Sequence, residues 1–114
     1  MQLIVNMIYN STEEIANASN YPKIRVFTAA LVPSASPVEE LLGIELKWSV
    51  ASPQSIGGPD WNYMSAVCWL YGRMIHQALG GRPMGLIATT WGGTAIELWM
   101  APKALQECDI PPYV

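Results

Sequence analysis

The residues with the clearest potential for chemistry form a glycine turn after an apolar run. Met84 to Ala88 is short and almost uninterruptedly apolar, and the pair Gly92-Gly93 follows it closely. This pattern predicts a strand of a parallel sheet, buried on both faces. In open α/β sheets, ligands bind beyond the carboxyl ends of the strands, where free backbone N–H groups can hold an anion or a developing oxyanion. The turn from Gly92 to Thr94 is therefore the first candidate site.

The residues after the glycines have the spacing of a capping box. Thr94 and Glu97 are three residues apart, so that each side chain would satisfy a backbone N–H group of the other at a helix start. The spacing predicts a helix beginning at about Ala95. A strand, a glycine turn and a helix also form a common structural connection, so this pattern alone is weak evidence of function.

More specific evidence comes from blocks distributed along the whole chain. They are Asn10-Ser11-Thr12-Glu13-Glu14, Tyr21-Pro22-Lys23-Ile24-Arg25-Val26, Leu46-Lys47-Trp48-Ser49, Met64-Ser65-Ala66-Val67-Cys68-Trp69-Leu70-Tyr71-Gly72-Arg73, Gly85-Leu86-Ile87-Ala88, and Trp91-Gly92-Gly93-Thr94 with Ile96-Glu97 and Trp99. In order and spacing, these blocks resemble the sialate O-acetylesterase family, a branch of the SGNH-type hydrolases.

The resemblance implies that residues 1–114 form a partial α/β domain. The expected architecture is an incomplete SGNH-hydrolase fold, which is flavodoxin-like and three-layered. Parallel strands are expected near 24–32 and 84–88, with a long helix near 61–79. The segment 33–60 is rich in Pro, Ser and Gly, and it is expected to be a surface excursion with a short edge strand at 45–50.

The resemblance also implies that the catalytic residues lie outside this chain. The family's nucleophilic serine lies in a Gly-Gln-Ser-Asn-Met sequence, and Met1-Gln2 is similar to the tail of that motif. The serine is thus expected just before Met1. A Gln-Gly-Glu segment and an Asp-x-x-His segment, which supplies the general base, are expected downstream of Val114. Serine, base and oxyanion donors act as one unit, so the chain alone is predicted to be inactive.

By resemblance, the glycine turn contributes to the oxyanion hole of the complete enzyme. Its candidate residues are Gly92, Gly93 and Thr94. Trp91 and Glu97 are candidates for substrate binding, because aromatic faces stack on pyranose rings and carboxylates accept hydrogen bonds from hydroxyls. The structural alternative is that Trp99 packs a helix on the sheet and that Glu97 only caps it.

The helix expected near 61–79 shows an apolar stripe that is predicted to face the core. The stripe comprises Met64, Val67, Cys68, Tyr71, Met74, Ile75 and Ala78. Asp60 is expected to cap this helix. His76 lies off the stripe and is predicted to be a solvent-facing histidine, and no serine follows the Gly-x-Ser-x-Gly pattern of a nucleophile elbow. A second, shorter helix is predicted from Thr12 to Ala18, because Ser11 and Glu14 also have capping-box spacing.

Composition indicates a folded chain and excludes some partners. The chain is 51% hydrophobic and 13% charged, which is unlike disordered proteins, and its net charge of −3 argues against nucleic acid. No run reaches the roughly 18 apolar residues that span a bilayer. Cys68 is expected to be a core thiol and Cys108 to lie in the tail, and neither a metal site nor a cofactor is expected. A sheet with so few strands would expose apolar surface and edges, which favours self-association.

Two sequons begin at Asn10 and Asn17 and are compatible with N-glycosylation. With the resemblance, they suggest a lysosomal or secreted parent protein, although this chain shows no signal peptide of its own. The expected function is therefore part of a sialate O-acetylesterase, which hydrolyses O-acetyl esters of sialic acids through an acyl-serine intermediate. The alternatives are a non-catalytic short product that binds glycan or pairs with a full-length partner, and an unrelated anion-binding module.

Overall fold

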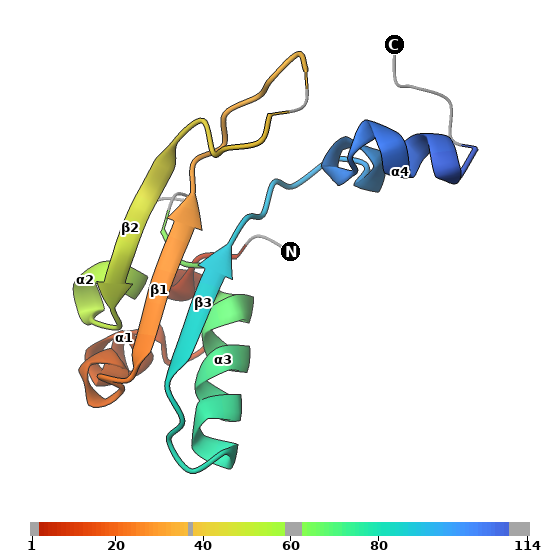
Figure 1. Cartoon of the computed structure of the whole chain (residues 1–114). Coiled ribbons are helices and arrows are strands. Elements are labelled where there is room, and N and C mark those ends of the chain that lie inside the picture. Colours follow the sequence, from red (N-terminus) through yellow and green to blue (C-terminus); the bar gives the residue numbers. More distant parts are fainter. Residues whose placement is uncertain (1–2, 37, 59–62, 110–114) are drawn as a thin grey trace.

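The computed structural model describes residues 3–36, 38–58 and 63–109. Strands β1 (Ile24–Ala29), β2 (Ile44–Val50) and β3 (Met84–Ala88) form a sheet in the order β2-β1-β3 (Figure 1). β1 pairs antiparallel with β2 and parallel with β3. The predicted parallel pair is therefore confirmed, as is the edge strand predicted at 45–50.

β1 is shorter than the predicted strand at 24–32. It ends at Ala29, after which the N–H of Ala30 donates to the carbonyl of Gly43. The N–H of Val32 then donates to the carbonyl of Ala30, which turns the chain out of the sheet. The strand therefore ends at Ala29, before the apolar sequence ends.

Along the chain, helical segments come before, between and after the strands. They are η1 (Val5–Met7), α1 (Ser11–Asn17), η2 (Ala18–Asn20), α2 (Pro53–Ile56), α3 (Ala66–Ala78), η3 (Ile96–Trp99) and α4 (Pro102–Glu107). The chain after β3 leaves the sheet and ends in η3 and α4, away from the other elements (Figure 1). We call residues 89–109 the arm, and the described residues from 3 to 88 the body. No helix in the described ranges is long and apolar enough to cross a membrane.

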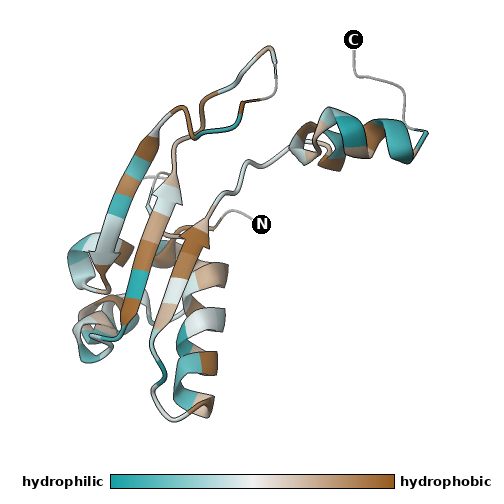
Figure 2. Ribbon diagram, viewed as in Figure 1, coloured by the Kyte–Doolittle hydropathy of each residue, from teal (hydrophilic) through white to brown (hydrophobic). Residues whose placement is uncertain are grey.

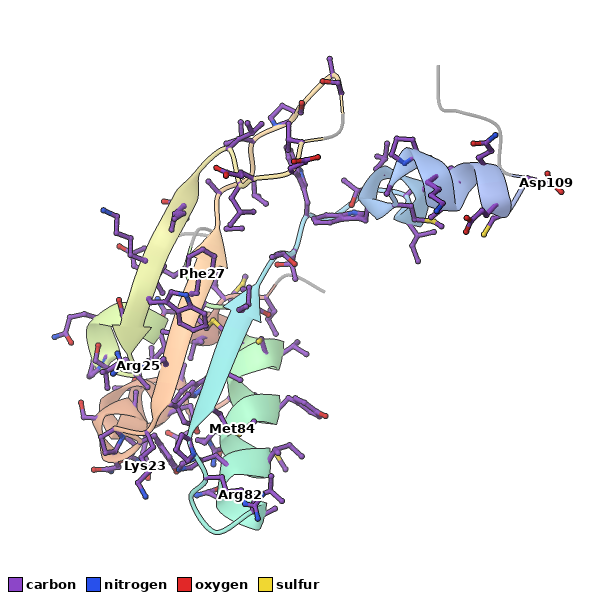
Figure 3. The ribbon with its side chains drawn as sticks, viewed as in Figure 1. Lys23, Arg25, Phe27, Arg82, Met84 and Asp109 are labelled. Atoms are coloured by element: carbon purple, nitrogen blue, oxygen red, sulfur yellow. The ribbon has the colours of Figure 1, made fainter. Side chains whose placement is uncertain are left out.

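The sheet has one covered face and one open face. Val26, Leu86 and Ala88 are buried on the covered face, whereas Ile87 is 55% exposed. Phe27 lies on the open face (Figure 3), where its ring packs against that of Trp48 at a centroid distance of 5.4 Å. The prediction that 84–88 is buried on both faces is thus wrong for the described structure, because its helices cover one face only.

The core joins α3 to β1, β3 and the N-terminal helices. Its largest fully buried side chains are Trp69, Ile24, Ile56, Met64, Val5 and Val26. Apolar residues are concentrated along β1 and β3 (Figure 2). Ala51 and Ile56 belong to this core, so the segment 33–60 is a surface excursion only in its first part. Its second part supplies β2 and α2. Ser52 caps α2 through a reciprocal capping box with Ser55.

The long helix starts later than predicted and faces the core with different residues. α3 begins at Ala66 with Ser65 as its N-cap, while Asp60 and Trp61 lie outside the described residues. A Cβ added at Gly72 would lie 2.3 Å from Leu86 Cδ2, so this glycine allows α3 to approach β3 closely. The buried face contains Ala66, Trp69, Gly72 and His76, whereas Val67, Tyr71 and Met74 of the predicted stripe are exposed.

His76 is buried, and the prediction of a solvent-facing histidine is wrong. Its side chain is only 7% exposed. Nδ1 lies 2.6 Å from the carbonyl oxygen of Arg82, in the turn that follows α3. The ring of Tyr21 packs edge-on against the imidazole at 6.0 Å. A hydrogen bond to a loop carbonyl therefore satisfies Nδ1 of this ring inside the body.

The capping box predicted at Ser11 and Glu14 does not form. Asn10 precedes α1 in the left-handed conformation, at φ 55°, and its side-chain amide donates to Glu13. Glu14 instead faces α3, where it accepts a hydrogen bond of 2.8 Å from Trp69 Nε1. Arg73 Nε lies 2.6 Å from the same carboxylate as an ion pair without hydrogen-bond alignment. Glu14 thus fixes α1 to α3.

Candidate active site

Three segments meet at the carboxyl end of β3. The N–H of Ala66, at the start of α3, donates to the carbonyl of Leu3 at 2.7 Å, and Ile4 forms a β-bridge with Ser65. One turn into α3, Cys68 Sγ lies 3.8 Å from the carbonyl oxygen of Ile87. The first described residues of the chain therefore lie beside the end of the strand that leads to the glycine turn. Met1 and Gln2, the expected tail of the nucleophile motif, lie outside the described residues.

The glycine turn has open space beside both of its glycines. Gly93 has φ 78°, a left-handed conformation that favours glycine at the third position of a turn from Trp91 to Thr94. A Cβ built at Gly92 or Gly93 would meet no atom within 4 Å. Within the described ranges, no residue accepts a hydrogen bond from the N–H of either glycine. This geometry suits an oxyanion hole, which stays a prediction for Gly92, Gly93 and Thr94.

Thr94 does not form the predicted capping box with Glu97. Its hydroxyl donates to the carbonyl of Trp91 at 2.7 Å and accepts from Trp99 Nε1 at 2.9 Å. The next element is the four-residue 3-10 helix η3, whose N-cap Ala95 makes no side-chain cap. The helix predicted from about Ala95 is therefore only this short 3-10 helix, and the predicted capping box is wrong, because the threonine hydroxyl is engaged within the turn.

The candidate substrate-binding residues lie in the arm, close to this turn in sequence. Trp91 is 38% exposed, and Glu97 is partly exposed in η3 without capping it. Trp99 is 51% exposed, so it does not pack a helix on the sheet as the structural alternative supposed. Substrate binding by Trp91 and Glu97 stays a prediction.

The titratable groups of the body are not assembled into a catalytic set at the turn. His76 lies at the opposite end of α3 from the N-cap Ser65, bonded to Arg82. Cys68 is half-buried, and burial raises the pKa of its thiol above the ordinary value. Cys108 is exposed at the end of α4, and neither cysteine forms a disulfide. In the part of the chain that the structure describes, no group of three His, Cys, Asp or Glu side chains could hold a metal ion.

Comparisons with known proteins relate the chain as a whole to carbohydrate esterases. No protein-family model matches the chain. The structure is similar to that of a carbohydrate acetylesterase from Xanthomonas citri, with a TM-score of 0.76 and 27% sequence identity over 94% of this chain and 23% of that one. The α/β fold of this chain thus resembles one segment of a carbohydrate acetylesterase.

The sequence matches specify the relatives further. The chain is 38% identical to the sialate O-acetylesterase of Homo sapiens and 36% identical to that of Mus musculus, over 111 residues or 97% of this chain in each case. The chain is therefore homologous to a segment of the sialate O-acetylesterases. It spans about one fifth of their length, 21% and 20% respectively.

Proposed function

We propose that the protein is an esterase that removes O-acetyl groups from acetylated carbohydrates, with O-acetylated sialic acids as substrates, through an acyl-serine intermediate. The observation that carries this proposal is the free Gly92 and Gly93 N–H groups at the carboxyl end of β3. Residues Leu3 and Ile4 lie at the same end of the sheet. In the resemblance, they follow the nucleophile motif almost directly. The turn would then hold the oxyanion formed when that serine attacks the acetyl carbonyl.

The chemistry divides between this chain and the rest of the enzyme. The chain supplies oxyanion donors and contacts to the sugar from Trp91 and Glu97. The nucleophile and its base come from outside residues 1–114, so the chain alone would not hydrolyse an ester. A preformed N–H pair lowers the barrier because it stabilises negative charge that develops only during attack.

The test removes one N–H group at a turn position that proline commonly occupies. Gly92 occupies the second position of the turn, where proline is favoured, and it has no positive φ. The test uses what we call the natural-length protein, a longer chain that also carries the expected nucleophile and base. In it, Gly92→Pro deletes this donor, whereas Gly92→Ala keeps it and places its Cβ in open space. If Gly92 donates to the oxyanion, Gly92→Pro should lower kcat about 100- to 1,000-fold, and Gly92→Ala should retain it. Full activity in Gly92→Pro would contradict a contribution of the Gly92 N–H group to an oxyanion hole at this turn.

Processing through a secretory route is a further part of this proposal. Asn10 precedes α1 and Asn17 is its last residue, and both are exposed, so each acceptor side chain is accessible to glycosylation. Such glycans would fit a lysosomal or secreted enzyme. Mass spectrometry of the protein from a secreting eukaryotic cell, before and after enzymatic deglycosylation, tests this; an unchanged mass would contradict it.

A non-catalytic role by association is the second candidate. Val67, Tyr71 and Met74 form an exposed apolar row along α3, and Ile87 and Trp48 lie on the open sheet face. Either surface would favour pairing with a full-length partner or a second copy. Analytical ultracentrifugation of the 114-residue chain tests this: a concentration-dependent dimer supports it, and a monomer throughout contradicts it.

A further inference from the structure

Trp99 is held in place by the same turn that carries the free N–H groups. Its Nε1–H donates to Thr94 Oγ1 at 2.9 Å, and the threonine hydroxyl donates in turn to the carbonyl of Trp91 at 2.7 Å. A hydroxyl has one hydrogen to donate and lone pairs to accept, so both bonds form together. The indole ring, the hydroxyl and the turn therefore constitute one hydrogen-bonded unit.

The surface that Trp99 leaves exposed is apolar. Trp99 as a whole is 51% exposed, although the only polar atom of its ring, Nε1, already has a partner. What faces solvent is therefore the carbon surface of the indole. The face of an aromatic ring carries partial negative charge, which attracts the weakly positive C–H groups of a sugar ring. A half-exposed tryptophan with a satisfied N–H group suits stacking better than hydrogen bonding.

The neighbouring side chains do not offer the same combination. Trp91 is exposed to a smaller extent, and its carbonyl, not its ring, is the atom that Thr94 holds. Ile96 and Leu98 are exposed in η3, but an aliphatic side chain has no ring face. Trp99 is thus the side chain in η3 that combines a flat apolar surface with a fixed edge.

We propose that Trp99 is the surface on which the pyranose ring of an acetylated carbohydrate stacks, and that Thr94 is the positioning residue that fixes the indole ring. This inference rests on the proposed function for the choice of ligand. The acetyl carbonyl would lie at the Gly92 and Gly93 N–H groups, while the sugar ring that carries it lies on Trp99. One eight-residue segment, from Gly92 to Trp99, would then bind both parts of the substrate.

The test compares a sugar ester with an ester that has no ring, using the natural-length protein. The substrates are the methyl glycoside of O-acetyl-N-acetylneuraminic acid and ethyl acetate. Trp99→Ala should lower kcat/KM about tenfold or more on the sugar ester, through a higher KM, and leave ethyl acetate within about twofold. The control Leu98→Ala, in the same 3-10 helix, should change neither.

Two milder variants separate the ring from its support. Trp99→Phe keeps a ring face but loses the N–H donor, and Thr94→Val keeps the shape but loses the hydroxyl. Each of these two variants should raise KM for the sugar ester about threefold. Thr94→Ser keeps the hydroxyl, so its KM for the sugar ester should equal that of the wild type. Equal losses on both esters, or no loss on either, in Trp99→Ala would overturn the inference.

A binding measurement distinguishes failure of this inference from failure of the proposed function. In protein labelled with ¹⁵N-tryptophan, the Trp99 indole signal is assigned by its loss in Trp99→Phe. The deacetylated methyl glycoside should shift this signal. If the wild type cleaves neither ester but the shift occurs, the esterase proposal fails and stacking on Trp99 stands. If the esters are cleaved and the glycoside causes no shift, the stacking inference fails alone.

Discussion

Trp69 and Trp99 both donate an indole hydrogen bond, but to partners at very different distances along the chain. Trp69 is fully buried and donates to Glu14, 55 residues away, whereas Trp99 is half exposed and donates to Thr94, five residues away. The first bond joins α1 to α3 across the body, and the second holds a turn of the arm. The body is therefore maintained by long-range packing, and the geometry of the candidate site by local hydrogen bonds.

Removing Trp69 is the most severe way to test this contrast. Trp69→Ala should lower the free energy of unfolding by about 3–5 kcal/mol, because it leaves a large cavity in the core and removes the hydrogen bond that Glu14 accepts from the indole, so that only Arg73 still pairs with this carboxylate. Tyr71→Ala, two residues along α3 and 68% exposed, is the matched control and should change it by less than about 0.5 kcal/mol. Urea denaturation measures both; similar losses would show that α3 does not face the core through Trp69.

The close approach of α3 to β3 gives the next largest effect. Gly72→Val would place its Cβ against Leu86, at 2.3–2.9 Å from three side-chain atoms. The overpacking should cost about 1–3 kcal/mol. Met74→Val introduces the same residue on the exposed side of α3 and should be close to neutral. Equal urea midpoints for the two variants would contradict the described contact.

Ion pairs should show the same division between body and arm. Glu14→Gln removes the charge beside Arg73 but keeps an oxygen for Trp69, and should cost about 1–2 kcal/mol, since both side chains of the pair are about four-fifths buried. Glu107→Gln breaks the exposed pair with Lys103 in the arm and should cost almost nothing. Thermal unfolding of both variants measures the difference in stability. An equal loss of stability in the two variants would contradict the contrast between the ion pairs of the body and the arm.

Backbone strain in the turn should have a smaller effect on stability. Gly93→Ala forces a side chain into φ 78° and should cost about 1 kcal/mol, although its Cβ would meet nothing. Gly92→Ala faces equally open space without positive φ, so it should be neutral or slightly stabilising. A larger loss in Gly92→Ala than in Gly93→Ala would contradict this turn geometry.

The two cysteines provide the mildest comparison. Burial raises the pKa of Cys68, so less of its thiol is ionised at pH 8, and its access to reagent is restricted. Cys108 is exposed in the arm. Iodoacetamide at pH 8 should therefore alkylate Cys108 first, as followed by peptide mass spectrometry. Faster alkylation of Cys68 would mean that the start of α3 opens readily.

Local sequence patterns predicted the strands better than the helix faces. The apolar run at 84–88 and the alternation at 45–50 lie where strands form, because strand periodicity is short and bounded by turn residues. The predicted buried face of α3 was wrong because Gly72 lets the helix pack closely against β3, and the pattern of apolar residues does not indicate such a contact. The prediction that His76 faces solvent was wrong because its hydrogen-bond partner is a backbone carbonyl, which leaves no signal in the sequence.

The candidate site was predictable in position but not in detail. The glycine pair after an apolar strand identified the turn, and the family resemblance gave it a role. The spacing of Thr94 and Glu97 was misleading, since a threonine hydroxyl can bond within the turn as readily as cap a helix. The bond from Trp99 to Thr94 depends on a 3-10 helix that bends the chain back, and no periodicity predicts so short an element.

The order of pairing in the sheet also has a consequence for how the chain acquires its structure. β1 joins β2 through the pair Arg25 and Val50, but it joins β3 through Ile24 and Met84, a loop more than twice as long. Each doubling of loop length adds about 0.6 kcal/mol of closure entropy. During synthesis, the β1–β2 pair can form while β3 is still untranslated. The strand that leads to the glycine turn would therefore dock late, and the speed of that docking would limit how soon the site exists.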